Sequence, residues 1–222
     1  MSAAPFLGIL MLDTRFPRPR GDIGHPLTFA FDVRRRVVRA ASPRDVVCTP
    51  DERLLDAFVA AGAALVKEGA AAIATSCGML ARWQRELQAA LPVPVWSSSL
   101  LALADELRGQ RCGVITIDAA SLTHAHFEAV GADPAPPVEG IAPGSALHRS
   151  LLDDLPTLDM ADANEQVLAA GRRLRAREPA LQALVLECTN LPPYADALRR
   201  ATGLPVHDIV TVLTLRMARL RG

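Results

Sequence analysis

Short apolar segments alternate with longer segments whose apolar residues recur at helical spacing along most of the chain. This alternation predicts βαβ units around parallel sheets, and so an α/β fold. The predicted strands cover residues 6–12, 36–40, 71–75, 93–96, 112–117, 183–187 and 204–207. The predicted helices cover residues 79–91, 100–108, 121–130, part of 144–152, 161–177, 192–202 and 209–220.

Capping and turn residues place one more helix and two loops. Thr49-Pro50-Asp51-Glu52 has the pattern of a capping box with proline at the first helical position, which predicts a helix from there to about Gly69. Residues 13–26 are rich in Arg, Pro and Gly and predict a long loop. Four prolines between residues 134 and 143 predict a second loop.

Two stretches of the chain repeat one order of elements. Residues 71–107 give a strand, Ser-Cys-Gly, a helix, Leu-Pro-Val, a strand and a helix. Residues 183–220 give the same order with Glu-Cys-Thr in place of Ser-Cys-Gly. The repeat predicts two pseudo-symmetric α/β halves with the active site in the cleft between them. We expect residues 1–98 with 206–222 in one half and 99–205 in the other.

Composition narrows the class of protein. The 24 basic and 24 acidic residues give no net charge, which argues against a nucleic-acid or membrane-surface partner. No apolar run reaches the length of a membrane span, which needs roughly 18 residues. No basic segment precedes the apolar residues 6–12, so we expect no signal peptide and a cytoplasmic protein. The four cysteines form no CxxC pair and have no histidine at metal-ligand spacing, which predicts free thiols and no metal site.

Cys77 and Cys188 occupy matching positions in the repeat, each between a strand and a helix. Ligands of open α/β sheets bind at the carboxyl ends of strands, so both thiols are expected at the site. A helix N-terminus should lower the thiol pKa and offer N–H groups to a carboxylate. Two thiols on opposite faces of an α-carbon could then remove and return its proton. Cys48 and Cys112 lack this placement and are expected to be structural.

The segments Thr75-Ser76-Cys77-Gly78 and Glu187-Cys188-Thr189-Asn190 resemble the two signature sites of the aspartate/glutamate/hydantoin racemase superfamily. The resemblance spans nearly the whole chain and implies two Rossmann-like halves, a substrate bound between them, and neither pyridoxal phosphate nor metal. Aspartate and glutamate racemases usually have Asn-Thr after the first cysteine, where this chain has Gly78-Met79. Glutamate racemases have His after the second Cys-Thr, where this chain has Asn190. Both departures argue against glutamate as the substrate.

Further site residues are expected around the two cysteines. By the resemblance, Asp13 assists one cysteine, and Thr116 and Ser121 present hydroxyls to a substrate carboxylate. Glu187 is expected to point away from the site, because side chains alternate along a strand. The remaining candidates for substrate binding are Thr75, Ser76, Gly78, Thr189 and Asn190 near the cysteines, and Arg15 and Arg20 in the first loop, where the arginines could grip a second carboxylate or face solvent.

The predicted function is a cofactor-independent amino-acid racemase or epimerase that acts on a small carboxylate. Two alternatives stay within the superfamily: an arylmalonate-decarboxylase-like enzyme, a type that keeps only the second cysteine, and a maleate-isomerase-like enzyme, which uses one cysteine as nucleophile. A third is a non-catalytic two-lobed binding or regulatory protein. Homodimers are common among proteins of this kind, but the sequence identifies no interface.

Overall fold

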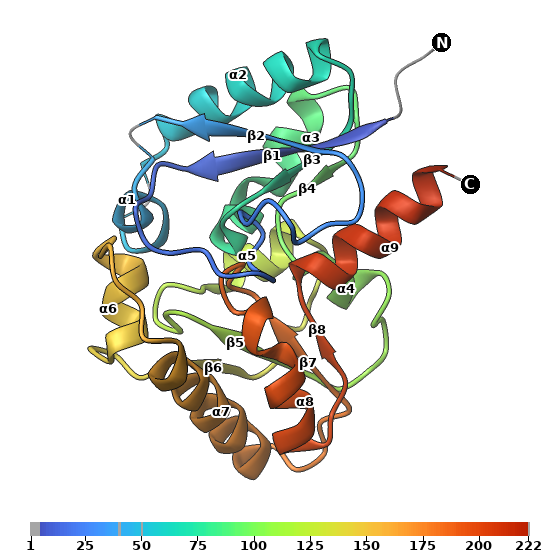
Figure 1. Ribbon diagram of the computed structural model, residues 1–222. Coiled ribbons are helices and arrows are strands. Elements are labelled where there is room, and N and C mark those ends of the chain that lie inside the picture. Colours follow the sequence, from blue (N-terminus) through green and yellow to red (C-terminus); the bar gives the residue numbers. More distant parts are fainter. Residues whose placement is uncertain (1–4, 40, 50, 222) are drawn as a thin grey trace.

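The computed structural model describes residues 5–39, 41–49 and 51–221, which form two four-stranded parallel sheets (Figure 1). The strands of the first sheet are β1 (Phe6–Leu12), β2 (Val33–Val38), β3 (Ala70–Thr75) and β4 (Val95–Trp96). Those of the second are β5 (Cys112–Thr116), β6 (Val138–Gly140), β7 (Ala183–Leu186) and β8 (Val206–His207). The orders β2-β1-β3-β4 and β6-β5-β7-β8 are equivalent, which confirms the two-lobed α/β fold predicted from the repeat.

Helices connect the strands and cover both sheets. In chain order they are α1 (Pro43–Val47), α2 (Leu54–Lys67), the 3₁₀-helix η1 (Gly78–Trp83), α3 (Gln84–Ala90), α4 (Leu101–Ala104), α5 (His124–Ala129), α6 (Ala146–Leu152), α7 (Met160–Arg177), the 3₁₀-helix η2 (Pro192–Tyr194), α8 (Ala195–Thr202) and α9 (Ile209–Arg221). Figure 1 shows α2 outside the first sheet, α7 and α8 outside the second, and α5 between the two halves.

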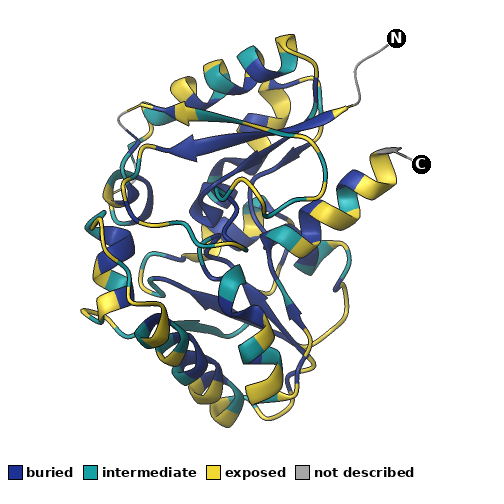
Figure 2. Ribbon diagram, viewed as in Figure 1, coloured by how far each residue is buried: buried dark blue, intermediate teal, exposed yellow. Residues whose placement is uncertain are grey.

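The central strands are buried on both faces, as expected of parallel sheets covered by helices. All seven residues of β1 and all four of β7 are buried, whereas the edge strand β2 is mostly accessible. Figure 2 shows this contrast as dark blue central strands within yellow and teal helices. The strands that lead to the two cysteines therefore lie in rigid core, which is where a site needs its supports.

The predicted capping box is wrong. The second helix begins at Leu54, and the Asp51 carboxylate instead accepts from the Arg53 N–H at 3.0 Å in a local turn. The sequence reading missed the helix just before it, α1, although Ser42-Pro43 has the same signature: the Ser42 hydroxyl accepts from the Asp45 N–H. Pro50 lies outside the described residues.

Two strand predictions also needed correction. The predicted strand 36–40 is β2 at 33–38, with Ala40 outside the described residues, and the three-residue β6 was missed within the proline-rich loop. β6 pairs with β5 over three residues only, too few to give a periodic pattern. The predicted helix 79–91 exists but starts as the 3₁₀-helix η1.

The halves contact each other through elements that cross between them. α5 packs against η1, α1 against α6, and α9 against β3. β8 pairs with β7, so residues 206 and 207 belong to the second sheet and the chain returns to the first half at α9. Residues 206 and 207 therefore lie in the other half from the one predicted. The rest of the predicted division, 1–98 with the C-terminal segment and 99–205, remains a prediction. Among the described residues, none of the helices combines the length and apolarity that crossing a bilayer requires.

Candidate active site

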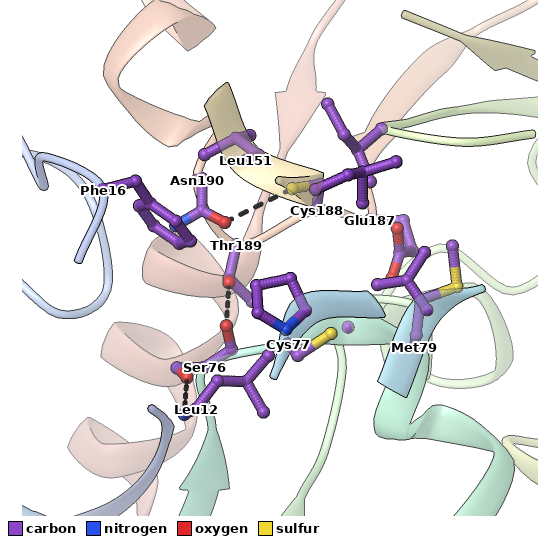
Figure 3. A pocket seen from close by; sticks show the side chains of 15 residues that line it. Leu12, Phe16, Ser76, Cys77, Met79, Leu151, Glu187, Cys188, Thr189 and Asn190 are labelled. Atoms are coloured by element: carbon purple, nitrogen blue, oxygen red, sulfur yellow. Dashed lines mark hydrogen bonds between the residues drawn. The ribbon is translucent and has the colours of Figure 1, made fainter. Parts of the chain in front are cut away.

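Cys77 and Cys188 follow the carboxyl ends of β3 and β7 and line one cavity between the two sheets (Figure 3). Figure 3 shows the two side chains on opposite sides of this space. Its other polar lining side chains are Ser76, Glu187, Thr189 and Asn190, and its apolar wall includes Leu12, Phe16, Met79 and Leu151. The space open to the centres of water-sized molecules is about 30 Å³, room for only a few waters. The cavity would therefore have to widen to hold a larger ligand.

Burial is the largest influence on the pKa values of both thiols. It raises the pKa of Cys77 to about 12, with a further increase from Glu187, against the opposing hydrogen bonds of the Met79 and Leu80 N–H groups. Burial also raises the pKa of Cys188 well above its ordinary value, again with Glu187 acting in the same direction. The predicted lowering of the thiol pKa by helix N-termini is wrong here, because desolvation is the larger effect. At neutral pH both side chains are thiols in the unliganded protein.

A chain of hydrogen bonds holds Cys188 from the first loop. The Cys188 thiol donates to Asn190 Oδ1 at 3.6 Å, and Asn190 Nδ2 donates to Asp22 Oδ2 at 2.6 Å. The other Asp22 oxygen accepts from Arg18 Nη1 at 2.9 Å and from the Gly24 N–H at 2.7 Å. The loop 13–26 is thus bonded to the site through Arg18 and Asp22. The arginines predicted from the sequence for this role were Arg15 and Arg20.

We expect Asp22→Asn to destabilise the protein and to lower activity. Asp22 is fully buried and the Arg18 side chain is 14% exposed, so loss of the charge leaves a largely buried guanidinium unpaired. Breaking such a pair costs about 3 kcal/mol. Urea unfolding measures it, with Glu52→Gln as control, since the exposed Glu52–Arg82 pair should contribute less than about 1 kcal/mol. Equal stability of the two variants would contradict this role for Asp22.

Glu187 is the residue that sequence reasoning misplaced. β7 ends at Leu186, so strand alternation no longer governs the next residue, and the Glu187 side chain lies in the cavity (Figure 3). Its Oε2 accepts from Thr116 Oγ1 at 2.6 Å, whereas Oε1 has no partner among the described residues. Burial raises the Glu187 pKa to about 7, against the opposing effect of the Thr116 hydrogen bond.

The missed signal for Glu187 was Gly78. A Cβ at Gly78 would overlap both the carbonyl oxygen and Oε1 of Glu187, far inside van der Waals contact. Gly78, which stands where aspartate and glutamate racemases usually have asparagine, therefore makes room for a buried carboxyl. The departure at Gly78 and the buried carboxyl of Glu187 are therefore one structural feature.

Ser76 and Thr189 line the cavity, but the Thr189 hydroxyl joins the two halves and the Ser76 hydroxyl joins two strand ends of the first half. Thr189 Oγ1 donates to the Ser76 carbonyl at 2.6 Å, and Ser76 Oγ accepts from the Leu12 N–H at 2.9 Å. These bonds fix the strand ends that carry Cys77 and Cys188. Both residues therefore act first as supports of the site.

Several predicted site residues do not line the cavity. Thr75 donates to the Ser97 carbonyl at 2.6 Å, Thr116 reaches the site only through Glu187, and Ser121 donates to Asp118 at 2.6 Å. Asp13, Arg15 and Arg20 are exposed.

Arg15 forms an ion pair with Asp154 at 3.2 Å, which joins the loop to the second half. Within the part of the chain that the structure describes, no three His, Cys, Asp or Glu side chains gather as a metal site would require.

The known proteins that this chain resembles in sequence are named dimethylsulfoniopropionate lyases. The chain is 31% identical to dimethylsulfoniopropionate lyase 6 of Emiliania huxleyi, over 97% of this chain and 60% of that protein. It is 30% identical to dimethylsulfoniopropionate lyase 7 of the same organism, over 97% of this chain and 67% of that protein. The chain belongs to the same family as these lyases. It spans only about three fifths of the length of some of them, and no protein-family profile matches it.

Solved structures place the fold in the predicted superfamily. Arylmalonate decarboxylase matches with a TM-score of 0.67 at 15% identity, over 98% of this chain and 93% of that one. An aspartate racemase homologue from Pyrococcus horikoshii matches with a TM-score of 0.63 at 15% identity, over 98% and 99%. Allantoin racemase from Klebsiella pneumoniae matches at 0.62 and 18% identity, over 98% and 88%. The fold is that of the aspartate/glutamate/hydantoin racemase superfamily.

Proposed function

We propose that this protein is a lyase that eliminates the 3-substituent of a small carboxylate, with dimethylsulfoniopropionate as the first candidate substrate. Two observations support it together. Cys77 and Cys188 line one cavity at the strand ends, and the relatives at about 31% identity over nearly the whole chain are named dimethylsulfoniopropionate lyases. Elimination therefore takes the place of racemisation as the first candidate reaction.

The reaction needs one base and a water-excluding pocket. A thiolate of the cysteine pair takes the proton from the carbon next to the carboxylate. The C–H electrons form the double bond to the third carbon, and the C–S bond breaks. Dimethyl sulfide leaves with that electron pair, and acrylate remains. The overall change is neither oxidation nor reduction, and the thiol proton then returns to solvent.

The bound substrate has to help form the thiolate, because burial keeps both thiols protonated in the unliganded protein. A sulfonium group brought into the cavity would favour a nearby thiolate and offset part of the desolvation. The Phe16 ring in the cavity wall could contact the same cation by its face. Substrate charge and thiol activation are in this way coupled.

A racemase or epimerase is the second candidate function. Its supporting observation is the pair itself, since racemisation uses a second thiol to return a proton on the opposite face of the carbon, whereas elimination needs only one base. The nature of the 3-substituent separates the two reactions: a good leaving group gives elimination, and its absence allows proton return. The decarboxylase-like, isomerase-like and non-catalytic alternatives have no comparable support.

The purified protein should release acrylate and dimethyl sulfide in equal amounts from dimethylsulfoniopropionate, with no cofactor added. Proton NMR follows both products. Aspartate, glutamate, allantoin and phenylmalonate serve as parallel substrates for the racemase and decarboxylase readings. Inversion of an amino acid without release of dimethyl sulfide would replace the lyase by the racemase. No reaction with any of these compounds would contradict both.

A further inference from the structure

The Glu187 carboxyl presents one oxygen that nothing in the described protein satisfies. Thr116 Oγ1 holds Oε2 at 2.6 Å, and Oε1 is buried without a hydrogen-bond partner. The residue is 1% exposed and lines the cavity that holds both thiols. Buried polar atoms without partners are rare in folded proteins, and one at a cavity wall points to a ligand that completes it.

The side chains around Glu187 Oε1 indicate which kind of ligand could bind there. Gly78 lies against Oε1 without a side chain, so the carboxyl has a fixed place beside Cys77. Figure 3 shows Met79 beside the Glu187 side chain, and the apolar wall of the same cavity also includes Leu12 and Leu151. In so apolar a space a carboxyl is more stable neutral than ionised, and a neutral carboxyl is a hydrogen-bond donor.

We propose that Glu187 binds the substrate carboxylate in its protonated form, with Oε1 donating a hydrogen bond to a carboxylate oxygen. The inference rests on the proposed function, in which the substrate is a carboxylate. Hydrogen bonds between a neutral hydroxyl and an anionic oxygen are short and strong. Negative charge grows on the substrate carboxylate as the neighbouring carbon loses its proton, so this donor stabilises the transition state more than the ground state.

Burial also shifts the pKa values of other groups around Glu187. Burial raises the pKa values of Cys77 and Cys188, and it raises the pKa of Tyr194 to about 12. The Asp22 carboxylate is held by its ion pair with Arg18.

His126, on the helix that packs against η1, has a lowered pKa from burial, and its ring bonds to Thr123. Among the ionisable side chains that line the cavity, Glu187 is therefore the one whose pKa lies close to neutral pH.

Propionate binding tests the proposal without turnover. Because the acid form binds, the affinity should be constant well below pH 7 and should fall about tenfold per pH unit above the pKa of about 7. Propionate itself is ionised throughout this range. Calorimetry in two buffers of different ionisation enthalpy should show uptake of nearly one proton per propionate at pH 8.

Three variants make the readout specific. Glu187→Gln keeps a donor but cannot titrate, so its propionate affinity should not change between pH 6 and 8.5, with no proton uptake. Thr116→Val removes the hydrogen bond that lowers the Glu187 pKa, so the fall in affinity should move to higher pH. Thr211→Val makes the same substitution away from the cavity, where the Thr211 hydroxyl donates to the backbone carbonyl of Asp208, and should leave the profile as in the natural protein.

The outcomes separate this inference from the lyase proposal. A flat pH profile in the natural protein, equal proton uptake in Glu187→Gln, or no propionate binding would each overturn the role of Glu187. Proton-linked binding without release of dimethyl sulfide would support Glu187 and contradict the lyase. Release of dimethyl sulfide with proton-independent binding would do the reverse.

Discussion

Replacing both Cys77 and Cys188 by serine is expected to lower turnover by roughly 10³-fold or more, since a positioned acid or base contributes about 10² to 10⁴ to a rate. The serine hydroxyl is nearly the size of the thiol but far less acidic, so the base is lost while the shape is kept. Steady-state release of acrylate measures the loss. Unfolding in urea should show that the double variant still folds cooperatively.

The single variants tell the two candidate reactions apart. A racemase should lose activity in both Cys77→Ser and Cys188→Ser, because each thiol serves one face of the carbon. A lyase should lose it in the variant that lacks the base and keep a substantial part in the other. Cys48→Ser and Cys112→Ser are matched controls, since neither residue lines the cavity. A double variant that keeps a tenth of the natural activity would contradict cysteine chemistry.

Gly78→Ala should destabilise the protein by about 3 kcal/mol and nearly abolish activity, which is the second large effect. The new Cβ would meet the carbonyl oxygen and Oε1 of Glu187, and a backbone oxygen in the core cannot move aside as a flexible side chain does. Relief of the overlap would displace the turn that carries Cys77, and with it one thiol of the pair. Urea unfolding and turnover of the same preparation measure both effects.

A second glycine provides the control for Gly78. Gly144 has nothing within 4 Å of a built Cβ but has a φ of +74°, so Gly144→Ala tests backbone conformation alone. That strain costs about 1 kcal/mol. Gly78→Ala should be clearly less stable than Gly144→Ala, and the opposite order would show that the Gly78–Glu187 contact is not tight.

The sequence predicted the parts of the fold that depend on periodicity. The buried strands at residues 6–12 and 183–186, the long helix α7 and the repeated strand order were all visible as apolar patterns. The very short elements were missed or misplaced: α1 and β6 have five and three residues, too few to show a period. Ser42, which the sequence analysis passed over, caps α1, whereas Thr49, which it chose, caps no helix.

The site was predicted where it depends on strand ends and misjudged where it depends on burial. Cys77 and Cys188 come together because parallel strands end at one edge. The thiol pKa shift had the wrong sign, because desolvation depends on three-dimensional packing that motifs do not encode. Asp22 and Glu187 could not be found from local pattern, since their partners Asn190 and Gly78 are distant in the chain.

The central claim is that a cysteine of this cavity breaks the C–H bond next to a carboxylate. Incubation of the protein in heavy water with dimethylsulfoniopropionate and a panel of L- and D-amino acids, followed by proton NMR, tests it most directly. We predict elimination from dimethylsulfoniopropionate, or entry of deuterium beside a carboxylate, in the natural protein and its loss in the double cysteine variant. Folded protein with free thiols that leaves every such C–H bond intact, or a double variant that reacts equally well, would contradict the claim.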